Sequence, residues 1–144
     1  MFSKRLTHVV TRKDLAVMLA PTYAASANVD WDEAHERMER ALGSQAIADA
    51  VWEGLSEALF TVQGKRTGED ELIDNLSAGV QKRRSRVKPA SLTPGVSAVM
   101  VMLNLELGFA PEMMRNALHE PKGQALLKAG LKELGLHLAQ QLIK

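Results

Sequence analysis

The sequence contains no cysteine, which excludes disulfide bonds, thiolate metal ligands and a cysteine nucleophile together. Aromatic residues make up only 4% of the 144 residues, so there is little material for stacking on nucleic-acid bases or sugar rings. The net charge is only +1, so the total charge does not indicate a class of partner. What remains is a globular composition with 46% hydrophobic and 24% charged residues, of the length of one domain.

Long hydrophobic runs are also missing. No stretch approaches the roughly 18 apolar residues that a bilayer span requires, and the longest, residues 95–110, is interrupted by Asn104 and Glu106. The N-terminus resembles a signal peptide, because basic residues precede a short apolar run and small residues follow it. Asp14 and Pro21 border that run and shorten it. We therefore predict a cytoplasmic chain that does not contact the membrane.

The chain is predicted to form a single all-α domain over residues 1–144, a compact bundle of six or seven helices. The spacing of apolar residues by threes and fours, together with start and stop signals, indicates helices rather than strands. The expected helices span residues 11–21, 31–42, 45–63, 67–84, 94–107, 111–119 and 121 to the C-terminal end. Connections of two to eight residues are usual in such bundles.

Capping residues set the expected helix ends. Thr11 with Asp14 three residues later forms the pattern of a capping box, and Thr67 with Asp70 repeats it. Pro21 is expected to end or kink the first helix, because proline lacks the amide hydrogen that continues the hydrogen-bond ladder. A residue in the left-handed conformation is expected at Gly43.

The helix over residues 94–107 is expected to lie at the centre of the bundle. Only three residues between Val96 and Leu107 are polar, and a helix that is apolar on all sides is buried on all sides. Residues 103–107 also alternate apolar and polar side chains in the manner of a strand. Only residues 6–10 could pair with such a strand. We therefore favour a helix, and not a strand, for residues 99–107.

Charge is distributed unevenly along the chain. Residues 30–75 carry four basic and twelve acidic groups, whereas residues 76–92 carry five basic groups and no acidic one. A basic N-terminal arm (about residues 1–10) and a basic connection (about residues 82–92) therefore flank an acidic middle. The candidate contacts to a nucleic acid or an acidic partner are Lys82, Arg83, Arg84, Arg86, Lys88, Lys4, Arg5, Arg12 and Lys13. The alternative is a solvated helix end whose cations complement the macrodipole.

Three carboxylates share one face of the helix expected over residues 45–63. Asp49, Glu53 and Glu57 follow one another at i,i+4 spacing, where like charges repel. No lysine or arginine on the same helix relieves them. We expect this face to meet cations from elsewhere, either the 82–88 run of the same chain or that of a neighbouring molecule.

The last helix carries a continuous leucine stripe that suits either self-association or burial within the chain's own bundle. The stripe consists of Leu127, Leu131, Leu134, Leu138 and Leu142. Gly130 and Gly135 would let a second backbone come close. Methionines cluster nearby, at Met100, Met102, Met113 and Met114. We expect these methionines to fill the core, although methionine also lines adaptable helix-binding grooves.

No arrangement of residues indicates catalysis. The run Asp32-Glu33-Ala34-His35 spells a helicase hydrolysis box, but Gly64-Lys65 lacks the upstream glycine of a phosphate-binding loop, and the run instead begins a helix. An enzyme would need a pocket that holds His35 with Glu36 or Glu39. We predict no catalytic residues, no metal and no cofactor.

The composition and patterning favour a non-enzymatic helical binding or assembly protein. It would act through protein–protein contacts, with a protein partner or as a homo-oligomer. The alternative is a nucleic-acid-binding helical protein, or a small subunit of a nucleoprotein complex, that uses the 82–88 run and the N-terminal arm. Steep salt dependence would distinguish phosphate contacts from apolar protein contacts.

Overall fold

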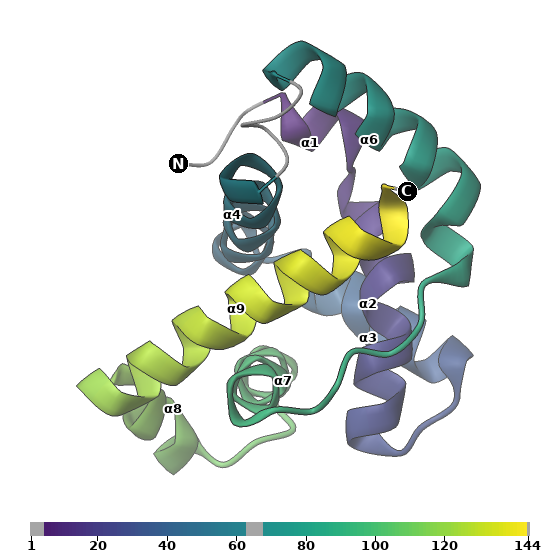
Figure 1. Cartoon of the computed structure of the whole chain (residues 1–144). Helices are drawn as coiled ribbons and strands as arrows, with labels where there is room; N and C mark the ends of the chain where they lie inside the picture. Colours follow the sequence, from purple (N-terminus) through teal and green to yellow (C-terminus); the bar gives the residue numbers. More distant parts are fainter. Residues whose placement is uncertain (1–4, 63–67, 144) are drawn as a thin grey trace.

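The computed structural model describes residues 5–62 and 68–143, and these residues are entirely helical apart from short connections (Figure 1). They contain no β-strand, so the all-α prediction is confirmed. The elements are α1 (Leu6–Val9), α2 (Arg12–Ala27), α3 (Trp31–Ala41), α4 (Gln45–Val62), α6 (Glu69–Arg83), the 3-10 helix η1 (Arg84–Arg86), α7 (Pro94–Leu107), α8 (Glu112–His119) and α9 (Pro121–Leu142). The seven longer helices correspond to the seven that the sequence predicts.

Most of the expected caps are present. The hydroxyl of Thr11 accepts from the amide of Asp14 at 3.2 Å, and the Asp14 carboxylate accepts from the amide of Thr11 at 2.9 Å, which completes the capping box. Thr93 caps α7 in the same way, and Gly108 ends α7 in the left-handed conformation with φ of 78°. The expected cap at Thr67 lies outside the described residues.

Pro21 lies inside the first long helix, so of the two predicted outcomes, an end or a kink, the end was wrong. Helix α2 continues through this proline to Ala27. The residues on both sides of it, Ala20, Thr22 and Tyr23 among them, are buried in the core. The burial of these side chains stabilises the helix by more than the roughly 3 kcal/mol that an internal proline costs.

Gly43 does not supply a left-handed exit from α3, so this prediction was also wrong. Helix α3 ends at Leu42 in the right-handed conformation, and Gly43 has no positive φ. The free carbonyl groups at this end are satisfied by Arg12, whose guanidinium donates to Leu42 O at 3.0 Å and to Gly43 O at 3.1 Å. A cation at a helix C-terminus also complements the macrodipole, which removes the need for a glycine turn.

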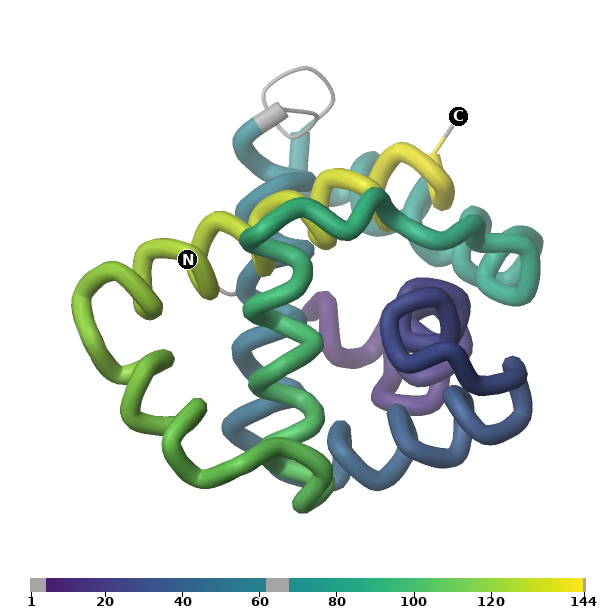
Figure 2. Tube along the Cα trace, turned by 90° about the horizontal axis from the view of Figure 1, so that it is seen from below, coloured from purple at the N-terminus to yellow at the C-terminus, as the bar shows by residue number. Residues whose placement is uncertain are grey.

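Helices α7 and α9 share the central position. Residues 94–107 form a helix along their whole length, as predicted, and do not form a strand. This helix, α7, packs against α2, α3, α8 and α9. Helix α9 spans the molecule from α8 to α6 and crosses both α4 and α7 (Figures 1 and 2). The buried side chains of α7 include the stripe of Val96, Val99, Met100 and Leu103. Glu106 is exposed, so the helix is not buried on all sides, contrary to the prediction.

Both crossings of α9 are made by pairs of glycines. At the α7 crossing, a Cβ added to Gly95 would lie 2.7 Å from the amide nitrogen of Gly130. At the α4 crossing, a Cβ added to Gly135 would overlap the backbone of Gly54. Distances this short leave no room for a side chain, so the helix backbones are in direct contact. The close approach that Gly130 and Gly135 permit is therefore made within the chain.

Within the part of the chain that the structure describes, no helix combines the length and the apolarity needed to cross a bilayer.

Candidate functional site

The N-terminal basic residues take part in the fold. Residues 5–10 do not form an extended arm, because Leu6 and Val10 are fully buried and the Trp52 indole donates to Val10 O at 2.8 Å. Arg5 binds Asp70 of α6 at 2.6 Å, and this hydrogen bond raises the pKa of Arg5 above its usual value. Lys4 lies outside the described residues.

Two arginines of the basic connection also hold the fold together. Arg83 donates to the carbonyl of Leu142 at 2.8 Å and so caps the C-terminal end of α9. Arg84 forms an ion pair with Asp14, the buried carboxylate of the α2 capping box. The ion pair places η1 against the first turn of α2, so the two basic stretches of the sequence meet on one side of the molecule.

Four of the predicted contact residues remain free among the described residues. Lys82, Arg86 and Lys88 have exposed side chains with no described hydrogen-bond or ion-pair partner. Lys13 is also exposed, but it lines a small cavity together with Glu39. The structure thus divides the eight described cations of the nine predicted ones into four anchors of the fold and four free surface charges.

The acidic face of α4 meets lysines of α9, and the two cations of the 82–88 run that have partners, Arg83 and Arg84, bind Leu142 and Asp14 instead. Glu57 lies 4.0 Å from Lys132, and Asp49 accepts a hydrogen bond from Gln45 at 2.7 Å. A cavity of about 260 Å³ between α4 and α9 is lined by Glu53 and Glu57 on one wall and by Lys128 and Lys132 on the other. The cations that face these carboxylates therefore belong to the same chain, but to α9 and not to the 82–88 run.

The leucine stripe of α9 packs mainly into the chain's own core. Leu134, Leu138 and Leu142 are buried, and Leu127 and Leu131 are partly buried against the same core. From the sequence, burial within the monomer was predicted as the alternative to self-association. Three of the five leucines consequently have no surface to offer a second molecule.

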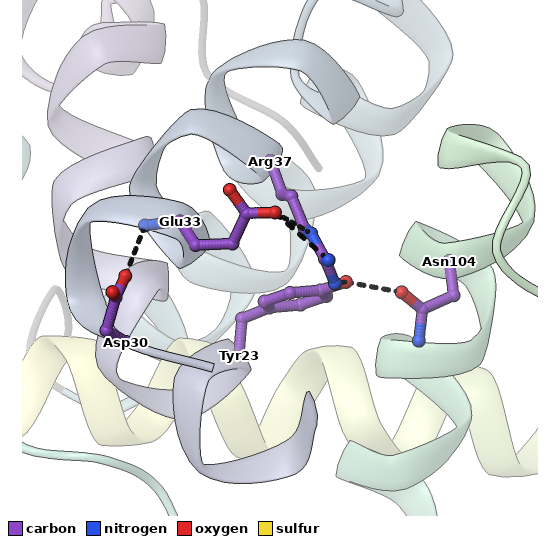
Figure 3. Close-up of polar contacts among 5 residues, drawn as sticks. All are labelled: Tyr23, Asp30, Glu33, Arg37 and Asn104. Atoms are coloured by element: carbon purple, nitrogen blue, oxygen red, sulfur yellow. Dashed lines mark hydrogen bonds and ion pairs between the residues drawn. The ribbon is translucent and has the colours of Figure 1, made fainter. Parts of the chain in front are cut away.

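A polar cluster ties α2, α3 and α7 together (Figure 3). The buried Tyr23 hydroxyl donates to Asn104 Oδ1 at 2.6 Å and accepts from Arg37 at 3.1 Å. Arg37 also binds Glu33 at 3.1 Å, and its guanidinium lies 4.4 Å from the centre of the Phe109 ring. The hydrogen bond to Tyr23, followed by that to Glu33, raises the pKa of Arg37. Each of the five side chains drawn has at least one polar partner, so the cluster serves packing between helices.

His35, the only histidine considered for catalysis, is held on the surface of α3. Its ring stacks on Trp31 with centroids 4.8 Å apart, and its Nδ1 lies 3.4 Å from Glu39. Among the described residues, no group of three or more histidine, aspartate or glutamate side chains is arranged to hold a metal ion.

The most unusual surface is one that sequence reasoning missed. Residues 108–129, which include α8 and the first turns of α9, contain no buried residue; we call this segment the α8–α9 hairpin. It nevertheless carries three large apolar side chains that are exposed: Met113 at 71%, Phe109 at 52% and Leu126 at 37%. The hairpin lies at one end of the molecule in both views (Figures 1 and 2).

A cavity of about 190 Å³ lies where the hairpin meets the rest of the bundle. It is lined by Leu118 of α8 and by Met102, Leu105 and Leu127 of α7 and α9. The expectation that all four clustered methionines fill the core was wrong for Met113. The detectable signal was the i,i+4 pair of Met113 and Ala117 beside that of Met114 and Leu118, an apolar face too wide for a helix with one packed side.

Comparison of the chain with protein-family models, with curated proteins and with solved structures finds no significant match.

Proposed function

We propose that this protein is a non-enzymatic binding protein that acts through protein–protein contacts, and that the α8–α9 hairpin is its contact surface. The observation that carries the proposal is the absence of any buried residue over 108–129 in a segment that contains Phe109, Met113 and Leu126. Large exposed apolar side chains concentrated in one segment of a globular protein favour an interaction site.

Binding of a partner would stabilise the α8–α9 hairpin more than any other part of the described chain. An isolated helix of eight residues is unstable in water, and α8 is stabilised only by partial contacts with α7 and α9. Covering Met113 would remove apolar area from water at about 25 cal/mol per Å². Methionine adapts its shape to the surface it meets, which suits it to an interface.

The proposed occupant is the hairpin of a second copy of this chain. The hairpin and the adjoining end of α7 carry exposed groups of both signs, Glu106 and Glu112 on the acidic side and Lys122 and Lys128 on the basic side. A surface that carries both signs can complement itself across a two-fold axis, because each acidic side then faces the partner's basic side. This interface replaces the leucine stripe, which the chain buries itself.

Sedimentation equilibrium over a wide concentration range tests the proposal. The wild-type chain is expected to form a dimer, and Met113→Lys or Leu126→Lys should weaken the dimer at least tenfold by burying a charge in the interface. Leu136→Lys is the matched control, since Leu136 is 40% exposed on the same helix but lies outside the hairpin.

A wild-type chain that stays monomeric at every concentration would overturn the proposed occupant. Equal weakening by Leu126→Lys and Leu136→Lys would show that the hairpin is not the interface. Circular dichroism of each variant separates loss of the dimer from loss of the fold.

A further inference from the structure

We infer that the surface around η1 binds the phosphate backbone of nucleic acid, without preference for base sequence. We call this surface the basic face; it consists of Lys82, Arg86 and Lys88 together with the half-exposed guanidinium of Arg84. It is independent of the α8–α9 hairpin, because α6 and α8 lie at opposite sides of the molecule in both views (Figures 1 and 2).

The backbone of the basic face is held in place while its free cations point outward. Val87 is buried, the Lys88 amide donates to Gln141 Oε1 at 3.1 Å, and the Lys88 carbonyl accepts from His137 Nε2 at 2.6 Å. Arg83 and Arg84 anchor the preceding turn through Leu142 and Asp14. A surface organised before binding loses little conformational entropy when a ligand arrives.

Helix-dipole matching does not account for these cations. Helix α6 ends at Arg83, so Lys82 and Arg83 lie in its last turn and complement its macrodipole. Arg86 and Lys88 follow the helix, where the dipole effect has already fallen away. The fold therefore does not explain why Arg86 and Lys88 are exposed without a described partner.

Among the described residues, no carboxylate is paired with the three free cations of the basic face, Lys82, Arg86 and Lys88. The sequence has no acidic residue between Asp74 and Glu106. Asp14, which packs against η1 from α2, is buried and already paired with Arg84, and Glu133 of α9 accepts a hydrogen bond from Thr93. The basic face thus keeps an uncompensated positive charge.

The chemistry of the surface favours phosphate over an acidic protein. Protein interfaces have an apolar centre, whereas the one apolar side chain within residues 82–88, Val87, points into the core. Residues 82–88 contain no exposed apolar or aromatic side chain, so their lysines and arginines match the charge of a phosphate backbone and cannot read bases by stacking. Binding should accordingly depend on charge alone.

The test measures the affinity of the full chain for a fluorescent 20-base-pair DNA duplex by anisotropy at several salt concentrations. The triple variant Lys82→Gln, Arg86→Gln, Lys88→Gln should bind at least tenfold more weakly. It should also lower the slope of log affinity against log salt by about two to three, since each phosphate contact contributes about 0.9. The variant Arg40→Gln, Lys132→Gln removes exposed positive charge outside both the basic face and the α8–α9 hairpin and should bind the duplex like the wild type.

Two results would overturn the inference. One is a comparable loss of binding in the basic-face variant and in the control variant, which would show a response to net charge alone. The other is competition by polyglutamate, matched in charge, as effective as competition by unlabelled duplex, which would identify an acidic protein as the partner. Sedimentation of the same variants shows separately whether the dimer persists, so this test and that of the proposed function fail independently.

Discussion

The backbones of Gly95 in α7 and Gly130 in α9 are in direct contact where the two helices cross. A Cβ at Gly95 would lie 2.7 Å from the amide nitrogen and 2.9 Å from the Cα of Gly130. A Cβ at Gly130 would overlap the carbonyl oxygen of Gly95. The atoms in the way belong to backbone on both sides, so neither helix can yield by moving a side chain. The spacing of the two central helices is consequently set by these two residues.

Replacement of Gly130 by alanine should destabilise the protein by about 1–3 kcal/mol, the usual cost of overpacking. Helix propensity alone predicts the opposite sign, because alanine stabilises a helix by about 1 kcal/mol relative to glycine. Urea denaturation monitored by circular dichroism measures the free energy of unfolding. The neighbouring exposed Ala129→Gly provides the control and should cost about 1 kcal/mol. A Gly130→Ala protein as stable as the wild type would contradict the close crossing.

The ion pair between Asp14 and Arg84 should be detectable as a coupling energy. Asp14→Ala removes the carboxylate of the α2 capping box together with the ion pair, at a cost of about 2 kcal/mol. Arg84→Gln removes the ion pair alone, at about 1 kcal/mol because Arg84 is half exposed. If the two residues interact as the structure shows, the double variant should be scarcely less stable than Asp14→Ala.

A double-mutant cycle by urea denaturation gives that coupling, which we expect to be about 1 kcal/mol. Lys82→Gln, a free cation two residues before Arg84, should change the stability by less than about 0.5 kcal/mol. Additive losses from Asp14→Ala and Arg84→Gln would mean that no ion pair forms in solution.

Local signals in the sequence were sufficient to find the helices. The partners of Thr11 and Thr93 lie three residues away, at Asp14 and Val96, so spacing alone predicts the contact. Gly108 ends α7 for the same local reason, because only the adjoining turn decides its conformation. Helix class and most helix boundaries were therefore predictable without knowledge of the tertiary structure.

The roles of the surface residues were not predictable in the same way. Arg12 finds its partners about 30 residues away at the end of α3, and Arg84 pairs with Asp14 70 residues before it. The periodicity of apolar residues in a sequence does not indicate pairs that lie so far apart along the chain. The failure at Pro21 has the same origin, since the packing that carries α2 through the proline comes from other helices. Sequence could therefore identify a basic surface, but not which of its cations are free.

The two tryptophans provide an optical test of the packing. Trp52 is 4% exposed and donates its indole N–H to Val10 O, whereas Trp31 is 43% exposed at the start of α3. In the variant Trp31→Phe only the buried indole emits. Its emission maximum should lie to the blue of the wild-type maximum, and its quenching by acrylamide should be several-fold weaker, because the quencher cannot reach a side chain enclosed by α1 and α4. N-acetyltryptophanamide sets the scale for a fully accessible indole. Quenching of Trp31→Phe as strong as that of this free compound would show that residues 6–10 do not cover Trp52.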